Sequence, residues 1–382
     1  MRVLFIHTGS DLYGASRCLL RLATRMVKDS DKVHVVLPYD GPLNAALESG
    51  GVNVLIEKSM PLLTRDMFRN ILSPFRLLLR SLVFASRLCR MVSNIRPDLI
   101  HVNTATVLPA SLPAAWLYGC RHTLHVRESF GEFGGLWRVL RAVFVMSFRR
   151  IICVSQYVAG QFKPDGKVCV INDGIPADEF DGVTSESINV FRKQHGFEGR
   201  PSVGVVGRIK IKRKGQETFI KAAALVAEKY PEAVFLLIGS PFPGNESHLT
   251  DVLGLAEKLG IRNKVIYTGD VKDVKSAISA LDVPVMSSGQ PEPFSNFVIE
   301  SMALSRCIVG TSCGGTSEQI EDGVTGVLVP PNDPESMAAA ICRLLADKQL
   351  QVSMGAAGRN RYMANFEFEP YYRKMCEVYQ QR

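Results

Sequence analysis

The stretch Glu292-Pro-Phe-Ser-Asn-Phe-Val-Ile-Glu300 places two carboxylates eight residues apart, at a junction between a strand and a helix. The apolar run at residues 281–286 before it predicts a buried strand, and the apolar residues within and after it recur at helical spacing, so a helix is expected to begin near Phe294. The first amides of such a helix are free to bind an anion. At ~1.5 Å of rise per residue, the two carboxylates lie at most about 12 Å apart, which is roughly the length of a nucleotide sugar.

The chain is longer than one hydrophobic core usually supports. Its 382 residues favour two domains, and 46% hydrophobic with 21% charged residues is typical of a globular protein. The nine cysteines include no Cys-x-x-Cys pair, and the opening run Met1 to His7 is too short for a secretory leader, so we expect a reducing, cytoplasmic setting. No uninterrupted apolar run reaches about 18 residues, so no membrane-spanning helix is expected.

Charge is distributed unevenly along the chain. Residues 1–180 contain 22 Lys or Arg against 14 Asp or Glu, whereas residues 181–382 contain 23 of each, so the net charge of +8 belongs to the first half. This asymmetry predicts an anionic partner, which could be nucleic acid, a lipid surface or a phosphorylated acceptor. Nucleic acid is not expected, because the chain has no recognised nucleic-acid-binding motif and no basic groove pattern rich in aromatic residues.

Strand-like apolar runs alternate with helical segments along both halves of the chain. This alternation predicts an α/β fold with parallel sheets that carry helices on both faces. The expected strands are Arg2 to His7, Val33 to Leu37, Val52 to Ile56, Leu99 to Val102, Thr123 to Val126, Arg150 to Val154 and Val168 to Ile171 in the first half, and Val203 to Val206, Val234 to Ile238, Val265 to Tyr267, Val283 to Met286, Cys307 to Gly310 and Gly326 to Val329 in the second.

The carboxyl edge of the first sheet is where ligands of open parallel sheets bind. The loop after the first expected strand ends in Gly14, followed by a helix from about Arg17 to Lys28. A glycine there permits close approach of the backbone to a ligand, or it simply makes a packing turn. His101 and His125 end two later strands of this sheet, and each is a candidate ligand-facing histidine, although a lone histidine is often a satisfied structural residue.

The second half opens with a strand that runs into a very basic loop, Gly207-Arg208-Ile-Lys-Ile-Lys-Arg-Lys214-Gly215. Arginine provides a planar fork of donors and lysine a compact charge, so this loop is suited to an anionic ligand. The remaining basic residues of this loop are either solvated charges or a second anion contact.

Taken together, these motifs resemble the retaining glycosyltransferases of group 1, which carry a Glu-x7-Glu signature. The resemblance covers nearly all of the chain and is densest from Val203 to Val329. It implies a GT-B fold, in which two Rossmann-like domains with parallel sheets face each other across a cleft. The implied division is an N-terminal acceptor domain (1–178), a nucleotide-sugar donor domain (179–361) and a C-terminal helix (362–382) that crosses back to the first domain.

The resemblance also implies the site residues. Arg208 and Lys214 would neutralise the donor diphosphate, and His125 is favoured over His101, with Arg127 and Glu128 as its orienting or acceptor-side neighbours. Glu292 would contact the donor sugar and Glu300 the ribose. The implied catalytic residues are His125, Glu292, Arg208 and Lys214, and the implied donor-binding residues are Gly14, Arg208, Lys214, Val271, Glu292, Phe294, Ser295, Asn296 and Glu300.

The expected activity is transfer of a sugar from a nucleotide-diphosphate sugar to an acceptor, with retention of configuration and without a cofactor or metal. No Asp-x-Asp motif follows a strand, and basic side chains with a helix N-terminus can supply the positive charge. The expected acceptor is a lipid-linked, polysaccharide or lipopolysaccharide precursor. Two alternatives stay open: a nucleotide-sugar epimerase of the same fold, and a nucleotide-sugar-binding subunit without turnover. A phosphorylase is disfavoured, since no motif for its pyridoxal lysine is present.

The segment from Arg65 to Arg96 contains seven arginines and one acid among many apolar residues. Pro74 should break it, and in the helix beyond, four arginines fall on one narrow stripe with most leucines elsewhere, namely Arg76, Arg80, Arg87 and Arg90. A second basic, apolar segment runs from Gly135 to Arg150. Both segments predict reversible docking on an anionic membrane at its inner face. The alternative is that both are ordinary sheet-covering helices whose arginines face water.

Overall fold

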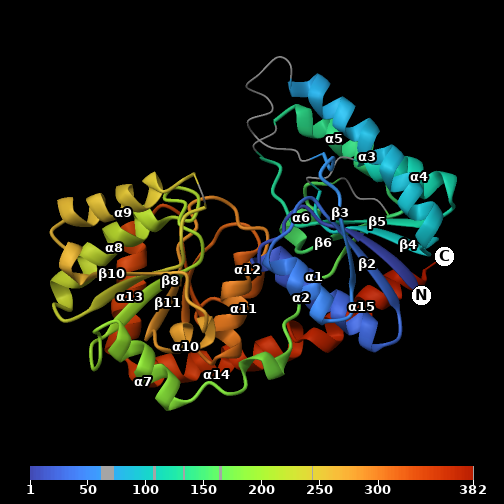
Figure 1. The fold of residues 1–382 in the computed structure, drawn as a ribbon. Helices are drawn as coiled ribbons and strands as arrows, with labels where there is room; N and C mark the ends of the chain where they lie inside the picture. Colours follow the sequence, from blue (N-terminus) through green and yellow to red (C-terminus); the bar gives the residue numbers. More distant parts are fainter. Residues whose placement is uncertain (62–72, 106–108, 132–133, 163–165, 243, 382) are drawn as a thin grey trace. The chain divides into compact units, whose positions relative to one another are not determined.

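The structure, a computed structural model, describes residues 1–61, 73–105, 109–131, 134–162, 166–242 and 244–381. The chain forms two compact units, each with one sheet and its own helices (Figure 1). Unit 1 comprises residues 1–173 together with 371–382, and unit 2 comprises residues 174–370.

The observed division falls at 173/174 and 370/371 rather than at the expected 178/179 and 361/362. Asp173 is tied to unit 1 by an ion pair with Arg127. Two residues later the backbone N–H of Ile175 already donates to the carbonyl oxygen of Phe366 in unit 2, at 3.0 Å. The chain therefore passes from unit 1 to unit 2 between Asp173 and Ile175.

Unit 1 contains seven strands and seven helices among its described residues. The strands are β1 (Arg2–Ile6), β2 (Lys32–Leu37), β3 (Asn53–Ile56), β4 (Leu99–Val102), β5 (Arg121–Val126), β6 (Arg150–Cys153) and β7 (Val168–Val170). The helices are α1 (Gly14–Lys28), α2 (Pro42–Ser49), α3 (Ser73–Ile95), α4 (Leu112–Leu117), α5 (Leu136–Ser147), α6 (Gln156–Ala159) and α15 (Phe368–Gln380), with a short 3-10 turn at Pro109–Ser111 before α4.

The seven strands form one sheet in the order β3-β2-β1-β4-β5-β6-β7, and every neighbouring pair is parallel. Central β1 is fully buried from Val3 to Ile6, as expected for a parallel strand covered on both faces. Helices α1 and α2 follow strands that step across the sheet in one direction, whereas α3 to α6 follow strands that step in the other. Right-handed crossovers therefore place the two groups on opposite faces (Figure 1).

Helix α15 belongs to the face of the sheet that α1 covers. Its Tyr372 hydroxyl donates to Asp29 Oδ2 at 2.7 Å, and the Arg25 guanidinium of α1 lies 4.7 Å from the Tyr372 ring centre. Farther along α15, the Tyr379 hydroxyl lies 3.0 Å from His101 Nδ1 of β4. The last helix of the chain thus completes the cover of the first sheet.

Unit 2 contains a six-stranded parallel sheet in the order β10-β9-β8-β11-β12-β13. Its strands are β8 (Ser202–Val206), β9 (Val234–Ile238), β10 (Val265–Gly269), β11 (Val283–Met286), β12 (Ile308–Thr311) and β13 (Gly326–Val329). Its helices are α7 (Ser185–Gln194), α8 (Gln216–Lys229), α9 (Ser247–Lys258), α10 (Val274–Ser279), α11 (Asn296–Ala303), α12 (Thr316–Gln319), α13 (Pro334–Ala346) and α14 (Lys348–Asn365). Helix α8 packs against α9 and α13 on one face, and α11 packs against α10 and α14 on the other.

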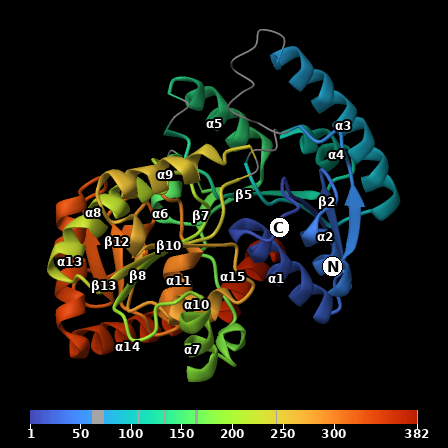
Figure 2. The same cartoon turned by 60° about the vertical axis from the view of Figure 1, so that its left-hand side comes forward.

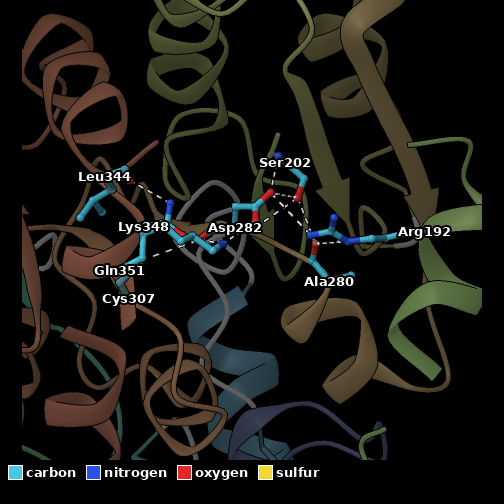
Figure 3. Close-up of polar contacts among 8 residues, drawn as sticks. All are labelled: Arg192, Ser202, Ala280, Asp282, Cys307, Leu344, Lys348 and Gln351. Atoms are coloured by element: carbon cyan, nitrogen blue, oxygen red, sulfur yellow. Dashed lines mark hydrogen bonds and ion pairs between the residues drawn. The ribbon is translucent and has the colours of Figure 1, made fainter. Parts of the chain in front are cut away.

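Asp282 joins several elements at the amino edge of this sheet (Figure 3). Its carboxylate accepts hydrogen bonds from the backbone N–H and the hydroxyl of Ser202, at 2.9 and 3.0 Å. The Lys348 ammonium of α14 lies 3.3 Å away and the Arg192 guanidinium of α7 lies 3.5 Å away. This network fixes α7 and α14 to the edge of the sheet opposite the one that carries the predicted donor residues.

The predicted α/β architecture with two Rossmann-like parallel sheets is confirmed. All the predicted strands are present, and their ends differ from expectation by one or two residues at most. Helix α11 begins at Asn296 rather than near Phe294, and α1 begins at Gly14 rather than Arg17. Pro74 lies in the first turn of α3, and the part of the basic segment at residues 62–72 lies outside the described residues. Within the part of the chain that the structure describes, no helix has the length and apolarity needed to cross a membrane.

Candidate functional site

The basic loop at residues 207–215 connects β8 to α8 at the carboxyl edge of the unit 2 sheet. Gly215 has a φ of 66°, and a Cβ at this position would lie 1.7 Å from the carbonyl oxygen of Ser287. Only glycine fits where the loop passes the end of β11. The Ser287 hydroxyl also donates to the carbonyl oxygen of Lys214 at 2.8 Å. The loop is therefore pinned against the neighbouring strand directly beside Lys214.

Gln216 holds the other side of this loop. Its side chain is buried at the start of α8; its Nε2 donates to the carbonyl oxygen of Arg208 at 3.0 Å, and its Oε1 accepts from the backbone N–H of Lys210 at 3.3 Å. The Arg208 guanidinium lies 4.7 Å from the ring centre of Phe242, a cation–π distance that orients it. Sequence reasoning missed Gln216, because an amide that acts on backbone groups has no recognisable motif.

Lys214 and Glu292, which the sequence placed far apart, are in direct contact. The Lys214 Nζ lies 2.7 Å from Glu292 Oε2, and the two side chains are 29% and 17% exposed. The Ser288 hydroxyl also donates to the same carboxylate oxygen, at 3.4 Å. An ion pair that water still reaches is only modestly stable, so a ligand can replace one of its partners.

The backbone at Glu292 is positioned by the turn after β12. The carbonyl oxygen of Glu292 accepts a hydrogen bond from the N–H of Gly315 at 2.8 Å. Gly314 has a φ of 67°, and a Cβ there would lie 2.4 Å from the Glu292 carbonyl oxygen. The glycine-rich turn therefore holds the backbone of Glu292, the first carboxylate of the Glu-x7-Glu stretch, in place.

The N-terminus of α11 is held by a second buried amide, that of Gln319. Its Oε1 accepts from the backbone N–H of Ser295 at 3.0 Å, and its Nε2 donates to the Ser295 carbonyl oxygen at 2.8 Å. Ser295 itself is buried and precedes Asn296, the first residue of the helix. The two bonds fix the backbone from which the first amides of α11 emerge. Gln319 is another residue that sequence reasoning did not identify.

The other predicted residues of unit 2 lie around this edge of the sheet. Glu300 is half-buried in the second turn of α11. The Phe294 ring meets that of Phe366 edge to face, with 5.7 Å between ring centres. Val271 follows β10 and packs against the buried cluster that includes Leu236.

His125 in unit 1 is fully buried, whereas its position at a strand end led us to consider it ligand-facing. Its ring lies 5.6 Å from that of His101, and its Nδ1 lies 3.5 Å from a guanidinium nitrogen of Arg127. Because guanidinium only donates, Nδ1 accepts and the proton resides on Nε2. That Nε2 has no hydrogen-bond partner among the residues that the structure describes. Burial, with the charge of Arg127, holds the pKa of His125 well below its usual value, so the ring is neutral.

Arg127 and Glu128 hold strand ends together. Arg127 forms an ion pair with Asp173 in which both side chains are buried. Burial alone lowers the pKa of the guanidinium, but the Asp173 carboxylate raises it above the usual value. Glu128 accepts from the backbone N–H groups of Ala105, at 3.2 Å, and of Arg127, at 2.9 Å. Arg127 is therefore placed to orient His125, while Glu128 organises the loop after β4.

Gly14 is the exposed first residue of α1, and its φ is not in the left-handed region. His7, which follows β1, connects α1 to the end of β4. Its Nε2 lies 3.0 Å from the Ser16 hydroxyl, and its Nδ1 accepts from Asn103 Nδ2 at 3.1 Å. Burial lowers the pKa of His7 to about 4, with a smaller effect from the charge of Arg127. The backbone geometry does not itself demand glycine at position 14, so close approach to a phosphate stays a prediction.

Among the described residues, no group of three or more His, Cys, Asp or Glu side chains is arranged to hold a metal ion. All nine cysteines are free thiols.

Two family models match the chain. Glycosyl transferases group 1 matches residues 200–347, and Glycosyltransferase Family 4 matches residues 13–179. Between them the matches take in most of both units. The chain belongs to the group 1 glycosyltransferases of GT-B fold.

Individual relatives are distant. The GDP-mannose-dependent alpha-(1-6)-phosphatidylinositol monomannoside mannosyltransferase of Mycolicibacterium smegmatis is 25% identical over 333 residues, which cover 82% of this chain and 84% of that protein. The lipopolysaccharide core biosynthesis glycosyltransferase LpsE of Rhizobium meliloti is 31% identical over 169 residues, which cover 44% and 46%. Among solved structures, Anabaena HepE in complex with UDP and glucose has a TM-score of 0.86 at 22% identity, with 100% of each chain covered. This last likeness shows the fold.

Proposed function

We propose that the protein transfers a sugar from a nucleotide-diphosphate sugar to a glycan or lipid-linked acceptor with retention of anomeric configuration. The observation that carries this proposal is the 2.7 Å contact between Lys214 and Glu292 beside the buried start of α11. An ammonium group and the first amides of a helix suit a diphosphate, and a carboxylate suits sugar hydroxyls. The named use of GDP-mannose by one relative and the UDP complex of HepE support a nucleotide-sugar donor.

In the proposed reaction, the bond between the anomeric carbon and the diphosphate oxygen breaks, and a bond from that carbon to the acceptor oxygen forms. The acceptor proton passes to the departing diphosphate. Arg208, Lys214 and the first amides of α11 stabilise the charge on the leaving group, so that no metal ion and no cofactor is required. Glu292 accepts hydrogen bonds from the sugar hydroxyls, and Glu300 accepts them from the ribose. Phe294, Ser295, Asn296 and Val271 line the donor.

For His125 we propose hydrogen-bond donation to the reacting sugars rather than proton transfer. Its neutral ring carries a buried Nε2–H without a partner among the described residues, and such a donor is costly unless a ligand satisfies it. Gly14 is proposed to offer its backbone N–H at the start of α1. We place the activity in the cytoplasm, at the inner face of a membrane, in polysaccharide or lipopolysaccharide precursor synthesis. The activities of two relatives, on a phosphatidylinositol mannoside and in lipopolysaccharide core synthesis, support an acceptor of this kind.

The deciding experiment measures sugar transfer from UDP- and GDP-sugars to a lipid extract, with and without EDTA, and determines the anomeric configuration of the product by NMR. We expect an EDTA-resistant product with the configuration of the donor. Activity lost to EDTA and restored by magnesium or manganese would refute metal independence, and an inverted product would refute retention. Donor binding without transfer would favour the non-catalytic subunit, and interconversion of donor sugars would favour the epimerase.

A further inference from the structure

Helices α3, α4 and α5 expose an unusual amount of apolar surface. Large apolar side chains are more than half exposed on all three, with 81% for Trp116, 74% for Met146 and 61% for Leu82. The side of α3 that packs on the core consists of other residues, including Phe84, Leu88 and Val92, which are fully buried. The outward apolar residues of these helices therefore do not contribute to the packing of unit 1.

These three helices lie together. Helix α3 contacts α4, and the short turn Pro109–Ser111 contacts α3, α4 and α5. All three cover the face of the unit 1 sheet that α1, α2 and α15 do not cover, as both cartoon views show (Figures 1 and 2). We define the α3–α5 surface by six of its exposed apolar residues, namely Leu78, Leu79, Leu82, Trp116, Leu117 and Met146.

The same helices carry charge of one sign. None of the three sequences contains an aspartate or a glutamate, whereas α3 exposes Arg76, Arg80 and Arg90, and α5 exposes Arg138. Arg87 is set apart, because it pairs with Glu57 at 2.8 Å. A surface that combines exposed leucines with exposed arginines and contains no acids is complementary to a layer that is apolar inside and negatively charged at its boundary.

The other helices of unit 1 serve as an internal comparison. Helices α1, α2 and α15 also cover one face of the same sheet, yet no large apolar side chain is exposed among their described residues. Covering a sheet in this protein therefore does not require outward leucines. The reading of α3 and α5 as ordinary covering helices with arginines in water does not explain Leu78, Leu79 and Leu82.

We propose that the α3–α5 surface docks the protein on a membrane that contains anionic phospholipid. Arginine guanidinium groups bind lipid phosphates through paired donors, and the leucines and Met146 enter the acyl boundary. Trp116, with the neighbouring Tyr118, sits at headgroup level, where such rings are preferred. This proposal rests on the proposed function only in explaining why the protein would bind a membrane: a lipid-linked acceptor would be presented at that surface.

The test is co-sedimentation of the full chain with vesicles of phosphatidylcholine alone or mixed with phosphatidylglycerol, at low and high salt, without donor or acceptor. We expect binding to the anionic vesicles that weakens with salt. Joint reversal of Arg76→Glu and Arg80→Glu should weaken binding by at least about tenfold, because two attractions become repulsions. The pair Leu79→Ser and Leu82→Ser should weaken it at both salt concentrations.

The matched control is Arg373→Glu with Lys374→Glu, which makes the same charge change on exposed positions of α15. It should bind vesicles as the wild type does. Equal weakening by this control would mean that net charge alone drives binding, and wild-type protein left in the supernatant with anionic vesicles at low salt would overturn the proposal. An oligomer that the leucine variants dissociate, with vesicle binding unchanged, would assign the surface to a second protein copy. Vesicle binding without sugar transfer would leave this inference intact and remove the proposed function instead.

Discussion

Lys214 and Glu292 form an ion pair, so a donor that contacts both side chains competes with a contact that already exists. We expect Glu292→Gln to release the ammonium, so that affinity for UDP or GDP stays the same or rises while sugar transfer falls. Lys214→Ala should instead lose one charged hydrogen bond to the diphosphate, at a cost of about 1.5–3 kcal/mol. Calorimetric titration with both nucleotides and initial-rate measurements separate the two effects.

The control for this pair is Lys258→Ala, which removes an exposed positive charge at the end of α9. Its nucleotide affinity should equal that of the wild type. The same loss of affinity in Lys214→Ala and Lys258→Ala would show that only net charge matters. Wild-type affinity in Lys214→Ala would remove this residue from the diphosphate site.

Gln319 acts on the site through backbone groups. Gln319→Leu leaves the buried N–H and carbonyl oxygen of Ser295 without their present partners, which is expected to destabilise unit 2 by roughly 1–3 kcal/mol per lost bond. Gln351→Leu is a matched change, since that buried amide donates to the Leu344 carbonyl oxygen of α13 at 2.8 Å and not to the backbone before α11. Urea unfolding should show a loss of stability in both variants, but only Gln319→Leu should weaken nucleotide binding. A parallel loss of binding in Gln351→Leu would contradict this assignment.

The charged residues of the candidate site could be predicted from sequence, and the residues that position them could not. Arginine, lysine and glutamate at recognised separations suggest their ligands directly, because the basic side chains suit a diphosphate and the carboxylates suit sugar hydroxyls. Gln216 and Gln319 work through main-chain atoms whose positions appear only after folding. The burial of His125 was also out of reach. Its ring lies against that of His101, which in turn meets the ring of Tyr379, a residue more than half the chain away from His125.

The loop between β8 and α8 depends on a single glycine. Gly215→Ala would combine a left-handed backbone with a Cβ 1.7 Å from the Ser287 carbonyl oxygen, so the loop must move away from β11. We expect lower thermal stability and a nucleotide affinity reduced by at least about tenfold, since Lys214 moves with the loop. Gly260→Ala is the control: its φ is 71°, but no atom lies within 4 Å of the added Cβ. It should lose about 1 kcal/mol of stability and no affinity.

Strands were predicted better than the orientation of helices. Runs of β-branched and aliphatic residues identify buried parallel strands directly, because both faces of such strands need apolar side chains. In α3 the pattern predicted only that most leucines lie away from the stripe of arginines. It left open whether those leucines face the protein or the solvent, and the structure shows Leu78, Leu79 and Leu82 exposed. Periodicity tells which residues share a side of a helix, but not which sides the rest of the molecule covers.

The buried histidines of unit 1 make its stability depend on pH. The pKa of His7 is lowered to about 4, that of His101 to about 3 and that of His122 to about 4, in each case chiefly by burial. All three belong to unit 1. In the unfolded chain such residues bind protons below a pH of about 6.5, whereas the folded unit does not. Their contribution to stability is therefore complete above that pH and is lost as the pH falls toward about 4.

We expect the free energy of unfolding of unit 1 to fall by roughly 1.4 kcal/mol per pH unit for each of these histidines as the pH drops below about 6.5. Both tryptophans, Trp116 and Trp137, lie in unit 1, so urea unfolding followed by tryptophan fluorescence reports this unit. His7→Asn should reduce the slope. A stability of unit 1 that does not change between about pH 6.5 and pH 5 would contradict the neutral, buried state of these rings.

The GT-B architecture followed from the alternation of strands and helices together with one signature, whereas the exact point of division, at 173/174 rather than 178/179, did not. The actual transition is set by two contacts of neighbouring residues, an ion pair of Asp173 and a backbone bond of Ile175. Such contacts have no trace in local composition, because each partner is distant in the chain.

Unit 2 is an insertion within unit 1, since residues 371–382 return to the sheet that residues 1–173 form. During synthesis on the ribosome, residues 174–370 emerge as one uninterrupted block and can fold before the last helix exists, as domains generally do. Unit 1, although it is made first, must wait: Tyr372 and Tyr379 reach Asp29 and His101 only after everything between them has been translated. The half of the protein that is synthesised earliest is therefore the last to become complete, and until then its exposed sheet is the part that a chaperone would have to protect.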